Sequence, residues 1–360
     1  MTAPLVSLFD PLPLGNITLK NRIVVSPMCQ YSALDGYATD WHLVHLGQFA
    51  IGQAGAVIQE ATAVSPAGRI SYGDLGLWED GQITKLSQIC QFIKDQGAAP
   101  GIQLAHAGRK ASTEKPWLGK RQYRPDEKNG WQTYGPSASP YYQDDVPPEA
   151  LSHSQIEQII SDFEHATKRA VQAGYDIIEI HAAHGYLIHQ FLSPLTNTRQ
   201  DDYGRSFENR VRFLMEIIQK VKPCLTEKHS LWVRISATDW ADGGWDVDQS
   251  IKLVNLLKEA GVQLIDVSSG GAVNHQKITT GPGYQMPFSS KIRTETGIKT
   301  GTVGLITTAQ EAQRAIETAT ADIILLGREF LRDPHLPLRW AKDLQIEIPY
   351  PGQYERAKFS

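Results

Sequence analysis

The sequence is poor in cysteine and in long apolar runs, and both shortages restrict what the protein can be. Its three cysteines, Cys29, Cys90 and Cys224, are odd in number and form no CxxC pair. They predict neither a disulfide framework nor a cysteine metal site, and they favour a reducing compartment. No apolar run is long enough to cross a bilayer, and residues 1–15 lack the basic start of a signal peptide. We therefore expect a cytoplasmic protein without a membrane partner.

A strong excess of charge is absent as well. The 35 Lys and Arg residues nearly balance 39 Asp and Glu residues, for a net charge of −4. This balance gives no reason to expect a nucleic-acid partner. The chain has 360 residues, of which 41% are hydrophobic, so it can bury a large core. Because α/β barrels of this length form single domains, we expect one domain over residues 1–360.

Short apolar segments alternate with segments of helical spacing. Ser152–Ala173 opens with Ser152 or Ser154 as a helix cap and ends before Gly174, and Val247–Ala260 and Thr307–Thr318 have similar patterns. This alternation is typical of a parallel sheet covered by helices. We predict a (β/α)8 TIM barrel preceded by an N-terminal hairpin. Its eight strands are expected at Arg22–Met28, Ala56–Glu60, Pro100–Leu104, Asp176–His181, Leu231–Ser236, Leu264–Ser268, Lys299–Val303 and Asp322–Leu326.

Residues 107–150 interrupt this rhythm. The segment is rich in Lys, Pro, Gly and aromatic residues and has no clear period. A loop this long in a compact domain is usually a functional lid or disordered. Its aromatic residues argue against full disorder, so we predict a lid insertion after the third strand, packed over the barrel mouth. We interpret Lys110 as a solvated surface charge in this loop.

Unusual residues follow several of the predicted strands, where barrels place their active sites. Cys29 and Tyr31 come after the first strand, and Gln103 lies near the end of the third. Glycine-rich turns at Gly304 and at Gly327-Arg328 follow the seventh and eighth strands. Backbone N–H groups at such turns bind phosphate, which favours a phosphate-bearing cofactor. The alternative is that these glycines only shape turns.

The fourth strand leads into His181-Ala-Ala-His184-Gly-Tyr186. Two imidazoles can donate hydrogen bonds to one carbonyl oxygen, and a protonated phenol can supply a proton. Alternatively, the histidines serve as caps or buried hydrogen-bonding groups. Further ligands for zinc are missing nearby.

Arg234 is a charge within a predicted strand and therefore needs a partner. One reading is a structural ion pair with Asp266 or Glu179. We favour the other, a fixed positive charge that faces an anionic cofactor.

Four motifs together resemble the old yellow enzyme family. The resemblance runs from about Leu8 to about Arg356, and Cys29 and His184 are similar to the bacterial thermophilic-like subclass, which includes xenobiotic reductases. The motifs are Ser26-Pro-Met-Cys-Gln-Tyr31, Gln103-Leu-Ala-His-Ala-Gly-Arg-Lys110, the segment from His181 to Pro194, and Asp202-Tyr-Gly-Arg-Ser-Phe-Glu-Asn-Arg210.

The resemblance implies an FMN enzyme that reduces activated C=C bonds of enones, enals and maleimides, or quinones and nitro compounds. NADPH or NADH would first reduce FMN, and the alkene would then take hydride from flavin N5 in a ping-pong cycle. The residues implied to hold FMN are Ser26, Pro27, Met28, Cys29, Ala63, Gln103, Arg234, Gly304, Gly327 and Arg328.

The same resemblance assigns further roles. His181 and His184 would bind the carbonyl oxygen, Tyr186 would donate the proton, and Tyr31 would line the substrate pocket. Cys29 would tune the flavin potential, and Arg234 would face the N1 edge of the reduced ring. Arg356, in a C-terminal tail over residues 345–360, would reach a neighbouring site and so implies a homodimer or homotetramer.

Other functions stay open at this stage. Related flavin barrels with iron–sulfur clusters need more cysteines than the chain has. A barrel that only binds a flavin or a phosphate, without catalysis, is a second alternative, and a zinc hydrolase is a third. No Rossmann fingerprint is present, so the nicotinamide cofactor would dock directly on the flavin.

Overall fold

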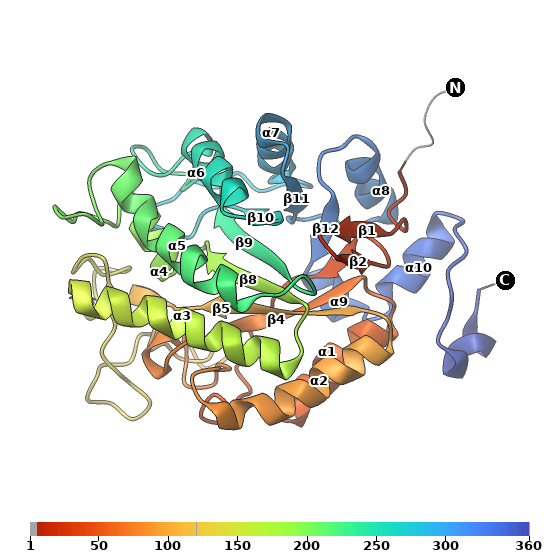
Figure 1. Cartoon of the computed structure of the whole chain (residues 1–360), viewed down its shortest axis with the longest axis horizontal. Coiled ribbons are helices and arrows are strands. Elements are labelled where there is room, and N and C mark those ends of the chain that lie inside the picture. The colour runs from red at the N-terminus through yellow and green to blue at the C-terminus, as the bar shows by residue number, and fades with distance from the viewer. Residues whose placement is uncertain (1–5, 120, 360) are drawn as a thin grey trace.

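Eight parallel strands close into a barrel in this computed structural model, which describes residues 6–119 and 121–359 (Figure 1). Each predicted segment overlaps one barrel strand, so the predicted fold is confirmed. The first strand is shorter than expected, because pairing stops at Val25 and leaves Ser26–Met28 beyond it. The barrel strands are β3 (Ile23–Val25), β4 (Ala56–Ala63), β5 (Ala99–Ala105), β8 (Ile177–Ala182), β9 (Ser230–Ser236), β10 (Leu264–Ser268), β11 (Lys299–Thr302) and β12 (Ile323–Leu326).

Helices surround the barrel (Figure 1). The longest helix begins and ends at the predicted caps. The Ser152 hydroxyl accepts from the Gln155 N–H at its start, and Gly174 ends it with φ 97°. The helices are α1 (Asp40–Ile51), α2 (Ile83–Asp95), α3 (His153–Ala173), α4 (Leu187–Leu192), α5 (Phe207–Val221), α6 (Val247–Glu259), α7 (Met286–Thr296), α8 (Ala309–Glu317), α9 (Arg328–Arg332) and α10 (Leu336–Asp343).

The N-terminal hairpin closes one end of the barrel. Its antiparallel strands β1 (Leu12–Leu14) and β2 (Ile17–Leu19) bury leucines against interior residues such as Ile177 and Trp232. A larger apolar core fills the layer between the strands and the helices. Since the hairpin occupies the amino-terminal end, the carboxyl ends of the strands are left for a site.

The insertion at 107–150 contains little regular structure but is tightly held. It includes a 3₁₀ turn at Gly108–Lys110 and the paired strands β6 (Tyr134–Gly135) and β7 (Glu149–Ala150). Arg109 donates to the carbonyls of Ser139 and Pro140 within the insertion and to that of Ala272 outside it. The segment therefore has a defined position beside the barrel mouth.

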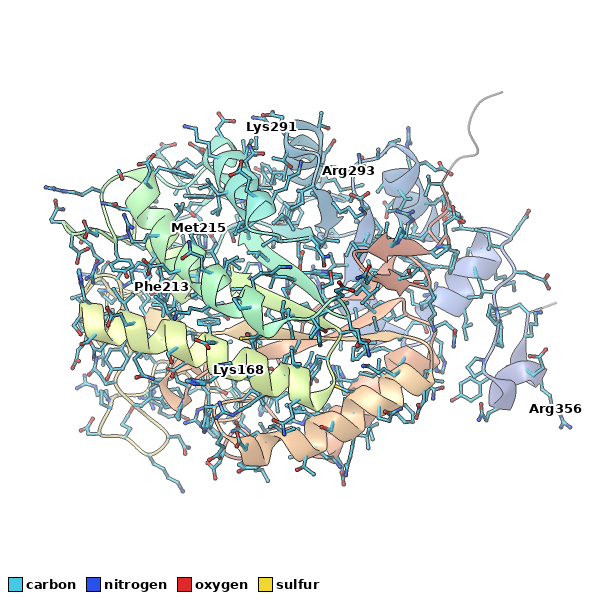
Figure 2. The ribbon with its side chains drawn as sticks, viewed as in Figure 1. Lys168, Phe213, Met215, Lys291, Arg293 and Arg356 are labelled. Atoms are coloured by element: carbon cyan, nitrogen blue, oxygen red, sulfur yellow. The ribbon has the colours of Figure 1, made fainter. Side chains whose placement is uncertain are left out.

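The C-terminal tail lies at the edge of the molecule. Its 3₁₀ turn at Gly352–Ala357 is exposed, and Figure 2 shows Arg356 projecting there. Within residues 6–119 and 121–359, no helix has the length and apolarity needed to cross a membrane. The predicted domain, insertion and tail include residues 1–5, 120 and 360, which lie outside the described residues.

Candidate active site

The turn after β8 brings His181, His184 and Tyr186 together. His181 lies within β8, and the chain then turns through His184 and Gly185, whose φ angles are 60° and 73°. The ring centroids of His181 and His184 are 5.3 Å apart, and those of His181 and Tyr186 are 5.1 Å apart. The three predicted side chains therefore form one cluster.

Contacts from distant parts of the chain hold His184 in this turn. Its backbone N–H donates to the Ser236 hydroxyl at 2.9 Å, and its carbonyl accepts from Lys110 Nζ at 2.8 Å. Its ring atom Nε2 lies 2.7 Å from the Ser268 hydroxyl. The expectation that Lys110 is a solvated surface charge was wrong, because the insertion folds its ammonium onto this turn. Burial, and then Arg109, lower the pKa of Lys110 to about 8.

The two imidazoles and the phenol of this cluster are neutral hydrogen-bond donors. Burial, followed by the positive charge of Arg234, holds the pKa of both His181 and His184 well below the usual range. Burial also raises the pKa of Tyr186 far above its ordinary value of 10.0, with Cys29 as a further cause. At neutral pH each imidazole therefore carries one ring proton, and the phenol keeps its own.

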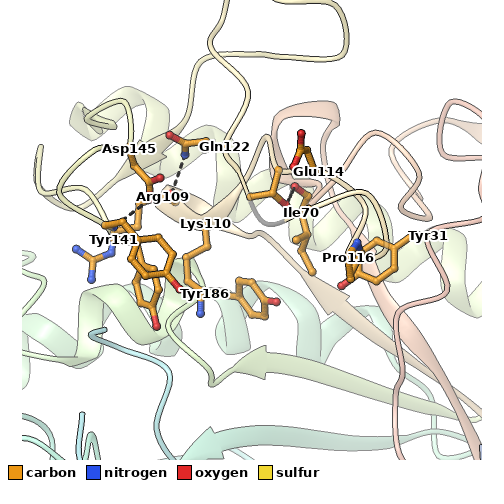
Figure 3. Close-up of a pocket in the computed structure, with 13 residues that line it drawn as sticks. Tyr31, Ile70, Arg109, Lys110, Glu114, Pro116, Gln122, Tyr141, Asp145 and Tyr186 are labelled. Carbon is orange, nitrogen blue, oxygen red and sulfur yellow. Dashed lines mark hydrogen bonds between the residues drawn. The ribbon is translucent and has the colours of Figure 1, made fainter. Parts of the chain in front are cut away.

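A cavity of about 270 Å³ opens between the insertion and the barrel mouth (Figure 3). Tyr31 and Tyr186 line it from the barrel side, and Lys110 and Tyr141 line it from the insertion. The ammonium of Lys110 lies 4.5 Å from the Tyr141 ring centroid and 5.3 Å from that of Tyr186. This cavity is small and partly aromatic, which suits a flat organic molecule.

A second cavity of about 530 Å³ lies at the same end of the barrel, bounded partly by the turns after β11 and β12. It falls within the range of about 300–1,000 Å³ that is typical of cofactor clefts. Gly304 has φ 129° and leaves backbone exposed to the cavity, beside Arg328. Seven of the ten predicted FMN residues line it, namely Ser26, Pro27, Met28, Arg234, Gly304, Gly327 and Arg328.

The residues of this second cavity fit a polar, phosphate-bearing group. The Ser26 hydroxyl is buried and has no hydrogen-bond partner among residues 6–119 and 121–359. A buried donor of this kind costs free energy unless something fills the cavity and pairs with it. Glycine turns and a guanidinium complete a cradle for an anion.

Comparison with known proteins identifies the family of this chain and the cofactor that the family uses. A family model described as the NADH:flavin oxidoreductase / NADH oxidase family matches residues 7–347. The chain belongs to this family. It is an oxidoreductase whose cofactor is FMN and whose reductant is NAD(P)H.

Individual relatives agree with the family assignment. An NADPH dehydrogenase of Bacillus subtilis (strain 168) is 46% identical over 351 residues, which cover 97% of this chain and 98% of the relative. Morphinone reductase aligns with a TM-score of 0.78 at 28% identity, covering 98% of this chain and 93% of that one. An old yellow enzyme homologue from Zymomonas mobilis aligns with a TM-score of 0.77 at 28% identity, covering 99% of this chain and 97% of that one. The resemblance drawn from the motifs is confirmed.

Arg234 forms the structural ion pair that was the less favoured of its two predicted roles. Its Nε lies 3.0 Å from Asp266 Oδ2, so a buried ion pair is present, and the side chain also lines the second cavity. That its charge faces an anionic cofactor stays a prediction. Glu179 lies nearby and accepts from Gln103 Nε2 at 2.7 Å. Burial, and then Asp266, raise the pKa of Glu179 to about 8.

We expect this carboxyl group to make the apoprotein less stable at high pH. The pKa of Glu179 rises from an ordinary 4.5 to about 8 in the fold, so the folded state binds the proton more tightly than the unfolded chain. Its contribution is present in full below pH 4.5 and is lost as the pH rises through about 8. In thermal unfolding of FMN-free protein at pH 6 and pH 9, Glu179→Gln should lose less stability than wild type. Glu157→Gln, on the exposed face of α3, is the control, and equal losses in all three proteins would contradict the expectation.

The remaining predicted residues lie at different depths. Cys29 is half-buried, and burial, followed by Asp74 and Glu60, raises its pKa, so the thiol stays protonated. Glu60 accepts from the Gln30 N–H at 2.7 Å and anchors the loop that carries Cys29. Ala63 lies beside Tyr186 in a small void, whereas Gln103 is buried against Glu179. Arg356 lies on the exposed tail and lines neither cavity of its own chain.

Several residues at the two cavities were missed by the sequence analysis. Ser268 ends β10 and contacts His184, while Gln285 donates to the Val303 carbonyl at 2.8 Å beside the second cavity. Ser268 could have been found, because it lies at the carboxyl end of a predicted strand. Gln285 and Tyr141 follow no such rule and became visible only in the fold.

Proposed function

We propose that this protein is an ene-reductase, which uses NAD(P)H to reduce the activated C=C bond of α,β-unsaturated carbonyl compounds. Enones, enals and maleimides are the expected substrates, with quinones and nitro compounds as further acceptors. The observation that carries the proposal is the cluster of two neutral imidazoles and one protonated phenol, in which Tyr186 lines a cavity and His181 and His184 pack behind it. Such a cluster can polarise a carbonyl group and protonate its neighbouring carbon.

Each side chain then has a defined task. His181 and His184 donate hydrogen bonds to the carbonyl oxygen and withdraw electron density from the β-carbon. Tyr186 delivers a proton to the α-carbon, while Tyr31 and the insertion shield the cavity from water. FMN, when bound, carries the electrons between NAD(P)H and the alkene. The residues proposed to hold it are Ser26, Pro27, Met28, Cys29, Ala63, Gln103, Arg234, Gly304, Gly327 and Arg328.

An anaerobic absorbance titration tests the proposal. The purified protein is titrated with NADPH and then with 2-cyclohexen-1-one. Bleaching of a flavin band followed by its return on addition of the enone supports both half-reactions. If NADPH bleaches the band but neither this enone nor a maleimide restores it, the ene-reductase proposal fails while the family assignment stands.

We also propose a homodimer or homotetramer, in which Arg356 enters the neighbouring site. Three exposed apolar side chains, here called the apolar strip, lie on α1 or in the loop before it. They are Leu34, Trp41 and Val44, which are 71%, 56% and 68% exposed. The Trp41 indole donates to the Gln30 side chain at 3.1 Å, one residue from Cys29, so the strip continues into the site. A second copy would cover this strip and place an arginine at the cavity.

Trp41→Asp should therefore produce a monomer, because a carboxylate cannot be buried unpaired in an apolar interface. Sedimentation velocity at micromolar concentration measures the change. Leu118→Asp, at an exposed position of the insertion, is the matched control and should keep the wild-type mass. A wild-type protein that sediments as a monomer would contradict the proposal.

The other expectations enter as proposals as well. One domain over residues 1–360 is supported by the single barrel against which both apolar cores pack. A cytoplasmic location is supported by the free state of Cys29, Cys90 and Cys224, which suits a reducing compartment.

A further inference from the structure

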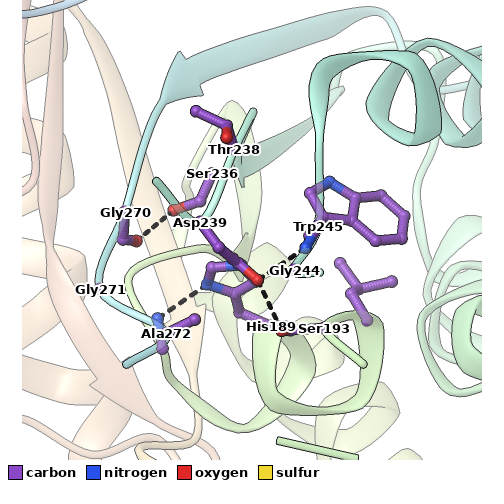
Figure 4. Close-up of polar contacts among 12 residues, drawn as sticks. His189, Ser193, Ser236, Thr238, Asp239, Gly244, Trp245, Gly270, Gly271 and Ala272 are labelled. Atoms are coloured by element: carbon purple, nitrogen blue, oxygen red, sulfur yellow. Dashed lines mark hydrogen bonds and ion pairs between the residues drawn. The ribbon is translucent and has the colours of Figure 1, made fainter. Parts of the chain in front are cut away.

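A buried histidine and a buried aspartate lie behind the catalytic cluster, and the proposed mechanism uses neither. His189 belongs to α4, and Asp239 belongs to the loop after β9. Both side chains are fully buried, and His189 Nε2 lies 2.9 Å from Asp239 Oδ1 (Figure 4). Neither residue lines the substrate or the cofactor cavity. Burying the Asp239 carboxylate costs free energy, because the charge loses its hydration.

The contacts of His189 determine which ring nitrogen carries the proton. Nδ1 accepts a hydrogen bond from the Gly185 backbone N–H at 2.9 Å, so Nδ1 itself is unprotonated. The ring proton of the neutral imidazole is therefore on Nε2, the nitrogen that lies 2.9 Å from Asp239 Oδ1. The other carboxylate oxygen, Oδ2, accepts from the Ser193 hydroxyl at 2.6 Å and from the Trp245 N–H at 2.7 Å. Two hydrogen bonds thus hold Oδ2, while Oδ1 lies against the His189 ring.

Gly185 is the residue between His184 and Tyr186, and its backbone needs to be held. His184 and Gly185 are both left-handed, which costs about 1–2 kcal/mol for a residue with a Cβ. The Gly185 carbonyl accepts from Gln190 Nε2 at 2.7 Å, and a Cβ on Gly185 would clash with the Gly271 carbonyl. The His189 ring satisfies the one remaining polar group of this glycine, its N–H.

We propose that His189 and Asp239 are positioning residues for the reaction. The carboxylate keeps the imidazole protonated on Nε2, so Nδ1 accepts from the Gly185 amide and sets the orientation of His184 relative to Tyr186. The inference rests on the proposed function for its catalytic consequence. The tautomer and the contact with Gly185 stand independently of that function.

Asp239→Asn tests the inference with almost no change in volume. The backbone N–H of Trp245 cannot accept, so the amide oxygen of the asparagine must stay at the Oδ2 position. Its NH₂ group then faces His189 Nε2 and forces the ring proton onto Nδ1, opposite the Gly185 N–H. The Nδ1–H of His189 and the N–H of Gly185 are then two donors facing each other, so the turn loses this hydrogen bond. Because small misplacements of reacting groups cost up to about 10²-fold, we expect reoxidation by 2-cyclohexen-1-one to slow by about 10- to 100-fold.

Two measurements are made on the FMN-loaded protein. Stopped-flow absorbance gives the rate of reoxidation after reduction by NADPH, and ¹⁵N NMR of labelled histidine reports which nitrogen of His189 is protonated. We expect a protonated Nε2 in wild type and a protonated Nδ1 in Asp239→Asn. Asp201→Asn is the matched control, since His153 Nε2 lies 3.0 Å from Asp201 Oδ2 at an exposed site, and it should reoxidise at the wild-type rate.

A second pair of variants keeps the inference testable if Asp239→Asn does not fold. His189→Asn retains an oxygen acceptor near the position of Nδ1, whereas His189→Leu does not. We expect His189→Asn to reoxidise faster than His189→Leu. Equal rates in this pair, a wild-type rate in Asp239→Asn, or an unchanged tautomer in a slow variant would each overturn the inference. If the wild-type protein is not reoxidised by any alkene, the proposed function fails instead, and the NMR result still decides the tautomer.

Discussion

Tyr186→Phe is expected to slow reoxidation of the reduced enzyme by 2-cyclohexen-1-one by roughly 10²–10⁴, the usual contribution of a positioned acid. The variant loses one oxygen and keeps the ring that packs 5.1 Å from His181. Burial raises the pKa of this phenol, so the wild-type group is protonated at any pH suitable for the assay. Reduction by NADPH requires no proton from Tyr186 and should be nearly unchanged.

Stopped-flow absorbance separates the two half-reactions. Tyr123→Phe is the matched control, because that phenol lies in the insertion and lines neither cavity. It should leave both rates at their wild-type values. If Tyr186→Phe slowed both half-reactions equally, the tyrosine would have a structural role and the assignment as proton donor would be wrong.

Arg234→Met is expected to destabilise the FMN-free protein by about 3–5 kcal/mol at pH 8, the cost of removing one partner of a buried ion pair. Arg234 lies 3.0 Å from Asp266, which is fully buried, and Glu179 lies close to both. Burial already raises the pKa of Asp266, and the guanidinium opposes that rise. Without the cation, both carboxyl groups take up protons more readily, so the loss should be smaller at pH 6.

Urea unfolding at pH 6 and pH 8 measures this effect. Arg339→Met is the matched control, because Arg339 pairs with Asp333 at 2.7 Å on the surface and should cost at most about 1 kcal/mol. The Arg234 variant should also retain less FMN after gel filtration, since this side chain lines the cavity proposed to hold FMN. A loss of stability that is no larger than that of the control would show that water or rearrangement compensates the carboxylates.

The sequence by itself determined the parts of the protein that depend on local patterns. Short apolar runs predicted the buried strands, and cap residues such as Ser152 and Gly174 predicted the helix ends. Both signals depend only on neighbours along the chain. The cluster at His181, His184 and Tyr186 was predictable for the same reason. Three side chains within six residues, at the end of one strand, come together once that strand turns.

Only the tertiary structure decided which distant groups meet. Lys110 contacts His184 across 74 positions, and Ser268 contacts it across 84, so no local pattern showed that either residue holds the turn. The pairing of Arg234 with Asp266 depends on the register of β9 with β10, and that of His189 with Asp239 depends on how α4 packs beside the loop after β9. Such contacts form when the barrel closes, because burial then forces each polar group to find a partner among whatever residues the fold brings near.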